Sequence, residues 1–218
     1  MRRMRRWIQS RSWALLFLPL AAAACSGKGE KASGRSGDEC DPDAGAAGAT
    51  LLTNGSFEQP AVPAGGYLTY ANGETFSGWT VIGATGNVAP LSTSFVSGFA
   101  FTAEDGEQSL DMTGTSDGTA TGIQQVVTTT AGHTYCLSFW VGNVYNPGGT
   151  YGTDSTINIL VDGKMVAVAT NEDQADTELS WEPFTATVVA AGASTTIAFI
   201  NGDPLGDGSN FLDNVSLR

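Results

Sequence analysis

Asp213 is the ionisable residue that its neighbours in the sequence constrain most. It lies in FLDNVSL, residues 211–217, a segment with the apolar content of a β-strand. Because side chains alternate between the two faces of a strand, we expect Asp213 on the core side with Phe211, Val215 and Leu217. A buried carboxylate is costly unless it is paired, hydrogen-bonded or bound to a metal. Backbone N–H bonds and a calcium ion, which prefers oxygen ligands, both stay open as explanations.

Aromatic and amide side chains that could bind a sugar lie mainly between residues 108 and 158. Sugar sites place aromatic rings against the apolar faces of pyranoses and amide groups against the hydroxyls. Trp140 is expected on the strand face opposite Leu137 and Phe139, with Asn158 one strand along on the same face. Alternatively, a loop or the N-terminal segment covers Trp140, and the tyrosines anchor their own loop. The predicted carbohydrate-binding residues are Trp140, Asn143, Tyr145, Tyr151, Asn158, Gln108 and Gln124.

Catalytic motifs are absent from the sequence. His133 is its only histidine, and one imidazole without cysteine partners does not make a typical zinc site. There is neither a G-x-S-x-G elbow nor a glycine-rich phosphate loop before a helix. Glu104, Asp105, Glu107 and Asp111 could pair as glycosidase carboxylates do, but a chain this acidic contains such pairs by chance. We therefore predict a noncatalytic protein.

The elements that must position these residues are strands. After residue 50 no segment has helical periodicity, and short β-branched or aromatic runs alternate with Gly, Asn, Asp and Pro clusters. Asp162-Gly163 is a typical hairpin turn between two of these runs. The pattern predicts an all-β sandwich or barrel. The expected strands are 67–70, 79–82, 109–113, 122–128, 133–141, 156–161, 165–170, 181–189, 195–200 and 211–217.

The N-terminal part predicts export. Arginines precede an apolar run at 13–24 that is too short to cross a bilayer, so we expect residues 1–24 to be a signal peptide. Three alanines before Cys25 resemble a bacterial lipobox, which predicts lipidation of Cys25, and Ser26 resembles lipoproteins sorted to the outer membrane. The alternative is ordinary cleavage after an A-x-A site, which leaves a free Cys25.

Residues 25–50 are expected to form a flexible tether, because they are rich in Gly, Ala, Ser and charged residues and poor in apolar ones. The remaining segment, 51–218, has the length of one domain. Cys40 in the tether and Cys136 in the domain could form a disulfide in an oxidising compartment or stay unpaired, and the sequence does not choose between the two.

The charge of the chain excludes some partners. The whole sequence carries a net charge of −12, and beyond residue 50 its only basic side chains are Lys164 and Arg218. Such a surface repels nucleic acid, so we expect no nucleic-acid partner, and it leaves few cations to pair with Asp213.

Five motifs in order resemble the galactose-binding-like jelly rolls, nearest to carbohydrate-binding modules of families 4 and 9 and to the cell-wall domain of unknown function 642. These motifs are LLTNGSFEQP, SGWTV, EDGEQSLDMTG, TGIQQVVTTTAGHTYCLSFWV and SNFLDNVSL. The resemblance implies a two-sheet antiparallel jelly-roll β-sandwich whose termini come together. In family members with a structural calcium, acids of the first and last strands are ligands, which assigns that role to Glu58 and Asp213.

Two functions follow from these expectations. The first is a noncatalytic, lipid-anchored protein of the cell envelope that binds a polysaccharide and carries a structural calcium. The second is a structural or protein-adhesion module of the envelope without a sugar ligand.

Overall fold

The computed structural model describes residues 40, 49–115, 121–204, 206, 208 and 210–218, and these contain strands and no helix. The predicted signal peptide, Cys25 and most of the predicted tether lie outside this part. None of the described residues belongs to a helix that could span a membrane. The strands are β1 (Tyr70–Ala71), β2 (Thr75–Phe76), β3 (Trp79–Gly83), β4 (Asn87–Ser92), β5 (Gln108–Asp111), β6 (Thr121–Thr128), β7 (Thr134–Asn143), β8 (Ser155–Val161), β9 (Lys164–Asn171), β10 (Ser180–Val189), β11 (Ser194–Asn201) and β12 (Phe211–Leu217).

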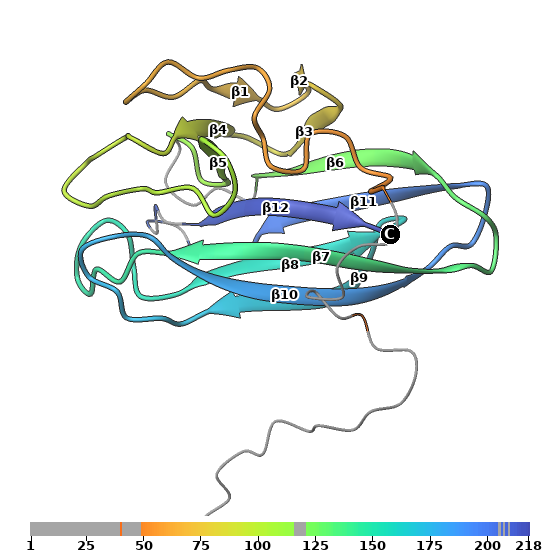
Figure 1. Ribbon diagram of the computed structural model, residues 1–218. Coiled ribbons are helices and arrows are strands. Elements are labelled where there is room, and N and C mark those ends of the chain that lie inside the picture. The colour runs from red at the N-terminus through yellow and green to blue at the C-terminus, as the bar shows by residue number, and fades with distance from the viewer. Residues whose placement is uncertain (1–39, 41–48, 116–120, 205, 207, 209) are drawn as a thin grey trace, which may run out of the picture. The chain divides into compact units, whose positions relative to one another are not determined.

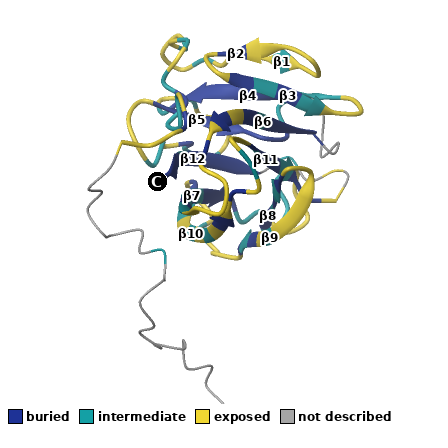
Figure 2. Cartoon of the chain, turned by 90° about the vertical axis from the view of Figure 1, so that its right-hand side faces the viewer, coloured by how far each residue is buried: buried dark blue, intermediate teal, exposed yellow. Residues whose placement is uncertain are grey.

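The strands form two antiparallel sheets, with the orders β1-β4-β5-β12-β7-β10 and β2-β3-β6-β11-β8-β9 (Figure 1). Figure 2 shows the two layers side by side, with β12, β7 and β10 in one and β11, β8 and β9 in the other. We call them the first and the second sheet. Successive strands such as β7 and β8 belong to different sheets, as in a jelly roll. The predicted all-β, two-sheet antiparallel sandwich is confirmed.

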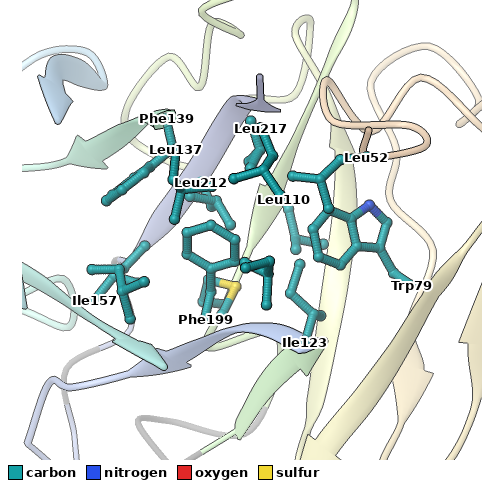
Figure 3. Close-up of a cluster of buried hydrophobic side chains, with 14 of the residues drawn as sticks. Leu52, Trp79, Leu110, Ile123, Leu137, Phe139, Ile157, Phe199, Leu212 and Leu217 are labelled. Carbon is teal, nitrogen blue, oxygen red and sulfur yellow. The ribbon is translucent and has the colours of Figure 1, made fainter. Parts of the chain in front are cut away.

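The main core fills the space between the sheets. Alternation on β7 buries Leu137, Phe139 and Val141, and alternation on β8 buries Ile157 and Ile159. These side chains meet those of the facing strands in one cluster, which includes Trp79, Leu110, Ile123, Phe199 and Leu212 (Figure 3). The alternating pattern therefore holds the two sheets together by apolar burial.

Most of the predicted strands lie within two residues of observed ones, but β2 and β4 were missed and the predicted strand at 67–70 is reduced to β1. Pro90 lies inside β4, where a residue without an N–H is unexpected. The Pro90 carbonyl group still takes part in a backbone hydrogen bond, which it accepts from Leu68 N–H. The predicted hairpin is present, because Asp162 and Gly163 both have positive φ angles, 49° and 76°, as a two-residue turn of this kind needs.

The last strand departs from simple alternation: Asp213 shares a face with Phe211, as expected, but the expectation that this face also carries Val215 and Leu217 and points to the core is wrong. The register of β12 shifts between Asp213 and Ser216, and Asn214 has a φ of 47°. This bulge inserts one extra residue. Val215 and Leu217 therefore face the main core, whereas Phe211 and Asp213 lie on the outer face of the first sheet, where Asp213 is paired with Trp140.

The two ends of the domain meet, as the jelly-roll resemblance implied. Leu51 N–H donates to the Leu217 carbonyl at 2.8 Å, and Leu217 N–H donates to Thr50 Oγ1 at 3.0 Å. Cys40 forms a disulfide with Cys136 of β7. Of the two alternatives for these cysteines, the structure has the bonded one, which fixes one point of the N-terminal segment to the first sheet.

Candidate ligand-binding site

A segment between β4 and β5, residues 93–107, covers the outer face of the first sheet. We call it the covering segment. Phe101 at its centre is 2% exposed and lies on Phe211 of β12, with 5.3 Å between the ring centroids. Gly142 of β7 leaves room on this face, because a Cβ there would come within 2.9 Å of both the Phe211 Cβ and the Trp181 ring. A second apolar cluster forms, whose buried members are Leu91, Phe101, Val144, Leu179 and Phe211.

Two carboxylates attach the covering segment to the domain. Asp213 Oδ2 accepts the N–H groups of Glu104 and Asp105 at 2.9 and 3.1 Å, and its Oδ1 accepts the N–H of Asn214. Glu58 Oε1 accepts the N–H groups of Glu107 and Gln108 at 2.8 and 2.9 Å. The two acids that the resemblance paired therefore do act on one loop, but through backbone hydrogen bonds. We call this arrangement the acid clasp.

Gly106 is required for the acid clasp. It has a φ of 74°, and a Cβ at this position would overlap the Glu58 carboxylate.

Burial dominates the electrostatics of the acid clasp. Asp213 is 0% exposed, and its desolvation raises its pKa to about 8, although three N–H groups partly offset the effect. Burial likewise raises the pKa of Glu104, whose carboxylate accepts a hydrogen bond from Asn214 Nδ2. The N–H explanation for Asp213 is thus present in the structure. Among the described residues, no three His, Cys, Asp or Glu side chains are grouped so that they could hold a metal ion, so a calcium ion would also need backbone carbonyl groups.

A pocket of about 240 Å³ opens beside the covering segment, over β4, β5 and β12. Aromatic rings form its walls in a chain of edge and tilted contacts: Tyr67 on Phe95, Phe95 on Phe101, and Phe101 on Tyr151 and Phe211. Tyr67 is 47% exposed and marks the open side. We call this hollow the outer-face pocket.

Asp111 is the one ionisable carboxyl group among the residues that line the outer-face pocket. It lies on β5, paired with Phe211, and is 9% exposed. Its Oδ1 accepts three hydrogen bonds, from Thr113 N–H, Thr113 Oγ1 and Gly114 N–H. Burial raises the pKa of Asp111 to about 7 against these bonds. No hydrogen bond from the described residues reaches its Oδ2.

The structure does not gather the predicted carbohydrate-binding residues in one place. Trp140 lies half-buried on the outer face of the first sheet, as expected from alternation. Asn158 lies on the outer face of the second sheet instead of beside Trp140, because the chain changes sheets between β7 and β8. Gln124 of β6 also lies on that opposite face.

Two of the predicted amide residues are structural anchors. Asn143 is fully buried, and its side chain bonds the carbonyls of Thr153 and Asp173. Gln108 is 4% exposed, and its amide group bonds the carbonyl groups of Phe57 and Pro60.

Of the two predicted tyrosines, Tyr151 lines the outer-face pocket and Tyr145 does not. Tyr145 lies at a separate, open hollow with Asp154 and Glu172. The sequence reasoning therefore named one residue of the pocket and missed Tyr67, Phe95 and Asp111. An available signal was the cluster of aromatic residues in SFVSGFAF, residues 94–101, which is too polar and glycine-containing for a strand of the main core.

The comparisons with solved structures return β-rich sugar-binding proteins, as the sequence motifs predicted. A family 35 carbohydrate-binding module from Clostridium thermocellum is 14% identical, with 69% of this chain and 96% of that chain covered and a TM-score of 0.40. TmCBM61 in complex with β-1,4-galactotriose is 16% identical, with 78% and 99% covered and a TM-score of 0.42. The EclA C-terminal domain, a sugar-binding protein, is 17% identical with a TM-score of 0.35, and the match covers 44% of this chain and 64% of that one. At these values the similarity carries no information on a ligand.

Comparison with protein families gives a match over the whole folded part. No curated protein matches the chain. The model of the HpiC1-like family, described as HpiC1 cyclase, matches residues 49–218, which is most of the sequence. The chain therefore belongs to the HpiC1-like family.

Proposed function

We propose that this protein binds a saccharide, without chemical change, in the outer-face pocket. One observation carries the proposal: a pocket of about 240 Å³ is lined by aromatic residues together with a carboxyl-bearing residue and several hydroxyl-bearing residues. Rings of this kind stack on the apolar faces of a pyranose, and a few convergent polar groups fix its orientation. The hydroxyl groups come from Ser97, Thr115, Thr150 and the tyrosines of the wall.

The test is retention on insoluble cellulose, chitin, pectin and the cell's own wall material. Retention that a free sugar reverses, and that Tyr67→Ala reduces at least tenfold, supports the proposal. Val126→Thr on the second sheet is the matched control and should retain fully. Retention on whole cells or protein fractions alone would support the other expectation, an adhesion module without a sugar ligand.

We further propose that the protein is exported and held at a membrane by a lipid on Cys25. The supporting observations are the signal-like N-terminus and the disulfide between Cys40 and Cys136, since disulfides persist in oxidising compartments. Metabolic labelling with a fatty acid should mark the protein, and Cys25→Ser should abolish the label. Label that persists in Cys25→Ser would refute the anchor.

A structural calcium belongs to the proposal, with Glu58 and Asp213 as its side-chain ligands. What supports it is the number of acids around the covering segment, since no Lys or Arg of the described residues is bonded to them. When bound, the ion would compensate the buried charge of Asp213. Calorimetric titration should show one calcium site that Asp213→Asn removes. If adding calcium produces no heat of binding and no rise in melting temperature, the calcium site is excluded.

A second candidate function uses the same pocket for catalysis, because the description of the family names a cyclase. Asp111, whose pKa burial raises to about 7, could donate a proton to an apolar unsaturated compound at neutral pH and recover it when the ring closes. Incubation with a panel of acyclic polyenes, followed by chromatography for products of unchanged mass, tests it. Turnover that Asp111→Asn abolishes would favour the cyclase over simple binding.

A further inference from the structure

Asp111 is a carboxyl group that lines an aromatic pocket and has no cationic partner among the described residues. None of the described residues that line the pocket is a Lys, Arg or His. Burial alone raises its pKa, the hydrogen bonds from Thr113 and Gly114 lower it, and no neighbouring charge contributes. The ionised form of this group is therefore poorly compensated by the protein itself, and a positive group from outside would stabilise it.

The walls of the pocket favour the same kind of ligand. Tyr67, Phe95, Phe101, Tyr151 and Phe211 line the pocket together with Asp111, and their rings contact one another. The face of an aromatic ring carries negative potential and attracts ammonium groups within about 6 Å. A carboxylate behind a ring of aromatic side chains is thus suited to a cation with an apolar body.

The charge of the whole chain acts in the same direction. A net charge of −12 raises the local concentration of cationic ligands and repels anionic ones. Acidic polysaccharides are therefore poor candidates for the pocket, and neutral sugars would gain nothing from the field.

We infer that the saccharide bound in the outer-face pocket carries a free amino group, whose ammonium pairs with Asp111 Oδ2 while the sugar ring lies against Tyr67 and Tyr151. The inference rests on the proposed function, because it names the class of saccharide for the same site. A hexosamine unit without an N-acetyl group satisfies both requirements. It offers a cation for the carboxylate and an apolar ring face for the aromatic wall.

The experiment compares three series of β-1,4-linked oligomers of equal length that differ only at C2: glucosamine, N-acetylglucosamine and glucose. Titration calorimetry at about 0.15 M salt limits attraction by the overall charge. We expect the glucosamine oligomer to bind at least tenfold more tightly than the other two. Asp111→Asn should remove this advantage, because its amide keeps the shape and an acceptor for Thr113 but loses the charge.

The matched control is Glu182→Gln, which changes the net charge equally at an exposed position of β10. It should leave the preference unchanged, and an equal loss in both variants would show attraction by overall charge and overturn the inference. Tyr67→Ala, at an exposed wall position, supplies a second variant if Asp111→Asn lowers the melting temperature, and it should weaken glucosamine binding at least fivefold.

The two levels of the proposal fail in different ways. Equal binding of the three series, or a wider panel positive only for neutral or acidic sugars, overturns the amino-sugar inference and leaves saccharide binding intact. No binding to any saccharide overturns the proposed function together with the inference.

Discussion

One outer face of this sandwich is covered by a loop, and the other is exposed. On the first sheet, the covering segment adds a second apolar cluster, a pocket and a set of buried acids. On the second sheet, the side chains stand in the open: Val126, Met165 and Val168 are 63%, 62% and 56% exposed. Both faces belong to sheets with the same number of strands. The difference shows that one loop, and not the sheets themselves, creates a place where a ligand can be held.

The largest effect on stability is expected from removing the buried side chain that packs the covering segment against the first sheet. Phe101→Ala should lower the free energy of unfolding by about 3–5 kcal/mol, because it deletes a buried ring that contacts Phe95, Tyr151 and Phe211. Chemical denaturation measures it. A loss below about 1 kcal/mol would mean that the covering segment is not part of the cooperative fold.

A smaller effect is expected from opening the acid clasp. Asp213→Ala leaves the N–H groups of Glu104, Asp105 and Asn214 without their acceptor, at about 1 kcal/mol each, so we expect a loss of about 3 kcal/mol. Denaturation in the presence of a chelator separates this from any bound ion. Amide hydrogen exchange should rise at Glu104 and Asp105 and stay unchanged in β8. Unchanged exchange at both residues would contradict the role of Asp213.

Asp111, on the covered face, should make the free energy of unfolding depend on pH. The pKa of Asp111 is about 7 in the folded chain, against about 3.9 for an unperturbed Asp, so the folded state binds this proton more tightly. The free energy of unfolding therefore falls as the pH rises from about 4 to about 7 and levels off above. Between about pH 5.5 and pH 7.5 this residue should account for a loss of about 2 kcal/mol.

Melting curves across this pH range test that prediction. Asp111→Asn should reduce the slope and leave the part that comes from Asp213, whose pKa of about 8 acts in the same direction, whereas Glu182→Gln should leave the slope unchanged. An identical slope in wild type and Asp111→Asn would exclude Asp111 as its origin.

The smallest effect is expected on the uncovered face. Val126→Thr keeps the β-branched shape and replaces an exposed methyl group by a hydroxyl, so the free energy of unfolding should change by less than about 0.5 kcal/mol. Sugar retention should be that of the wild type. A loss above about 1.5 kcal/mol would indicate that this face is covered in solution.

The sequence was sufficient to predict the parts of the fold in which core-facing and outward-facing side chains alternate along a strand. Leu137, Phe139, Ile157 and Ile159 show the alternation that fixes a two-sided core, and the Asp162-Gly163 turn has its own local signature. Alternation failed as a rule where a bulge interrupts a strand and where successive strands belong to different sheets.

The bulge at Asn214 turned Asp213 to the other face, and the crossing between β7 and β8 separated Asn158 from Trp140. Neither event has a strong signal in a single sequence. The pocket was missed for a related reason. Its residues come from segments far apart in the chain, so spacing along the sequence cannot bring Tyr67, Asp111 and Phe211 together.

The disulfide at Cys40 would limit how far the domain can lie from a membrane if the proposed lipid anchor is present. If the lipid is on Cys25, the chain from Cys25 to Cys40 has 40 − 25 = 15 steps and can span at most about 50 Å. After reduction, the next attachment to the domain is at Thr50, whose side chain accepts a hydrogen bond from Leu217 N–H. The chain from Cys25 to Thr50 has 50 − 25 = 25 steps and can span at most about 85 Å. The oxidation state of one bond would then set the radius within which the domain can search for its ligand.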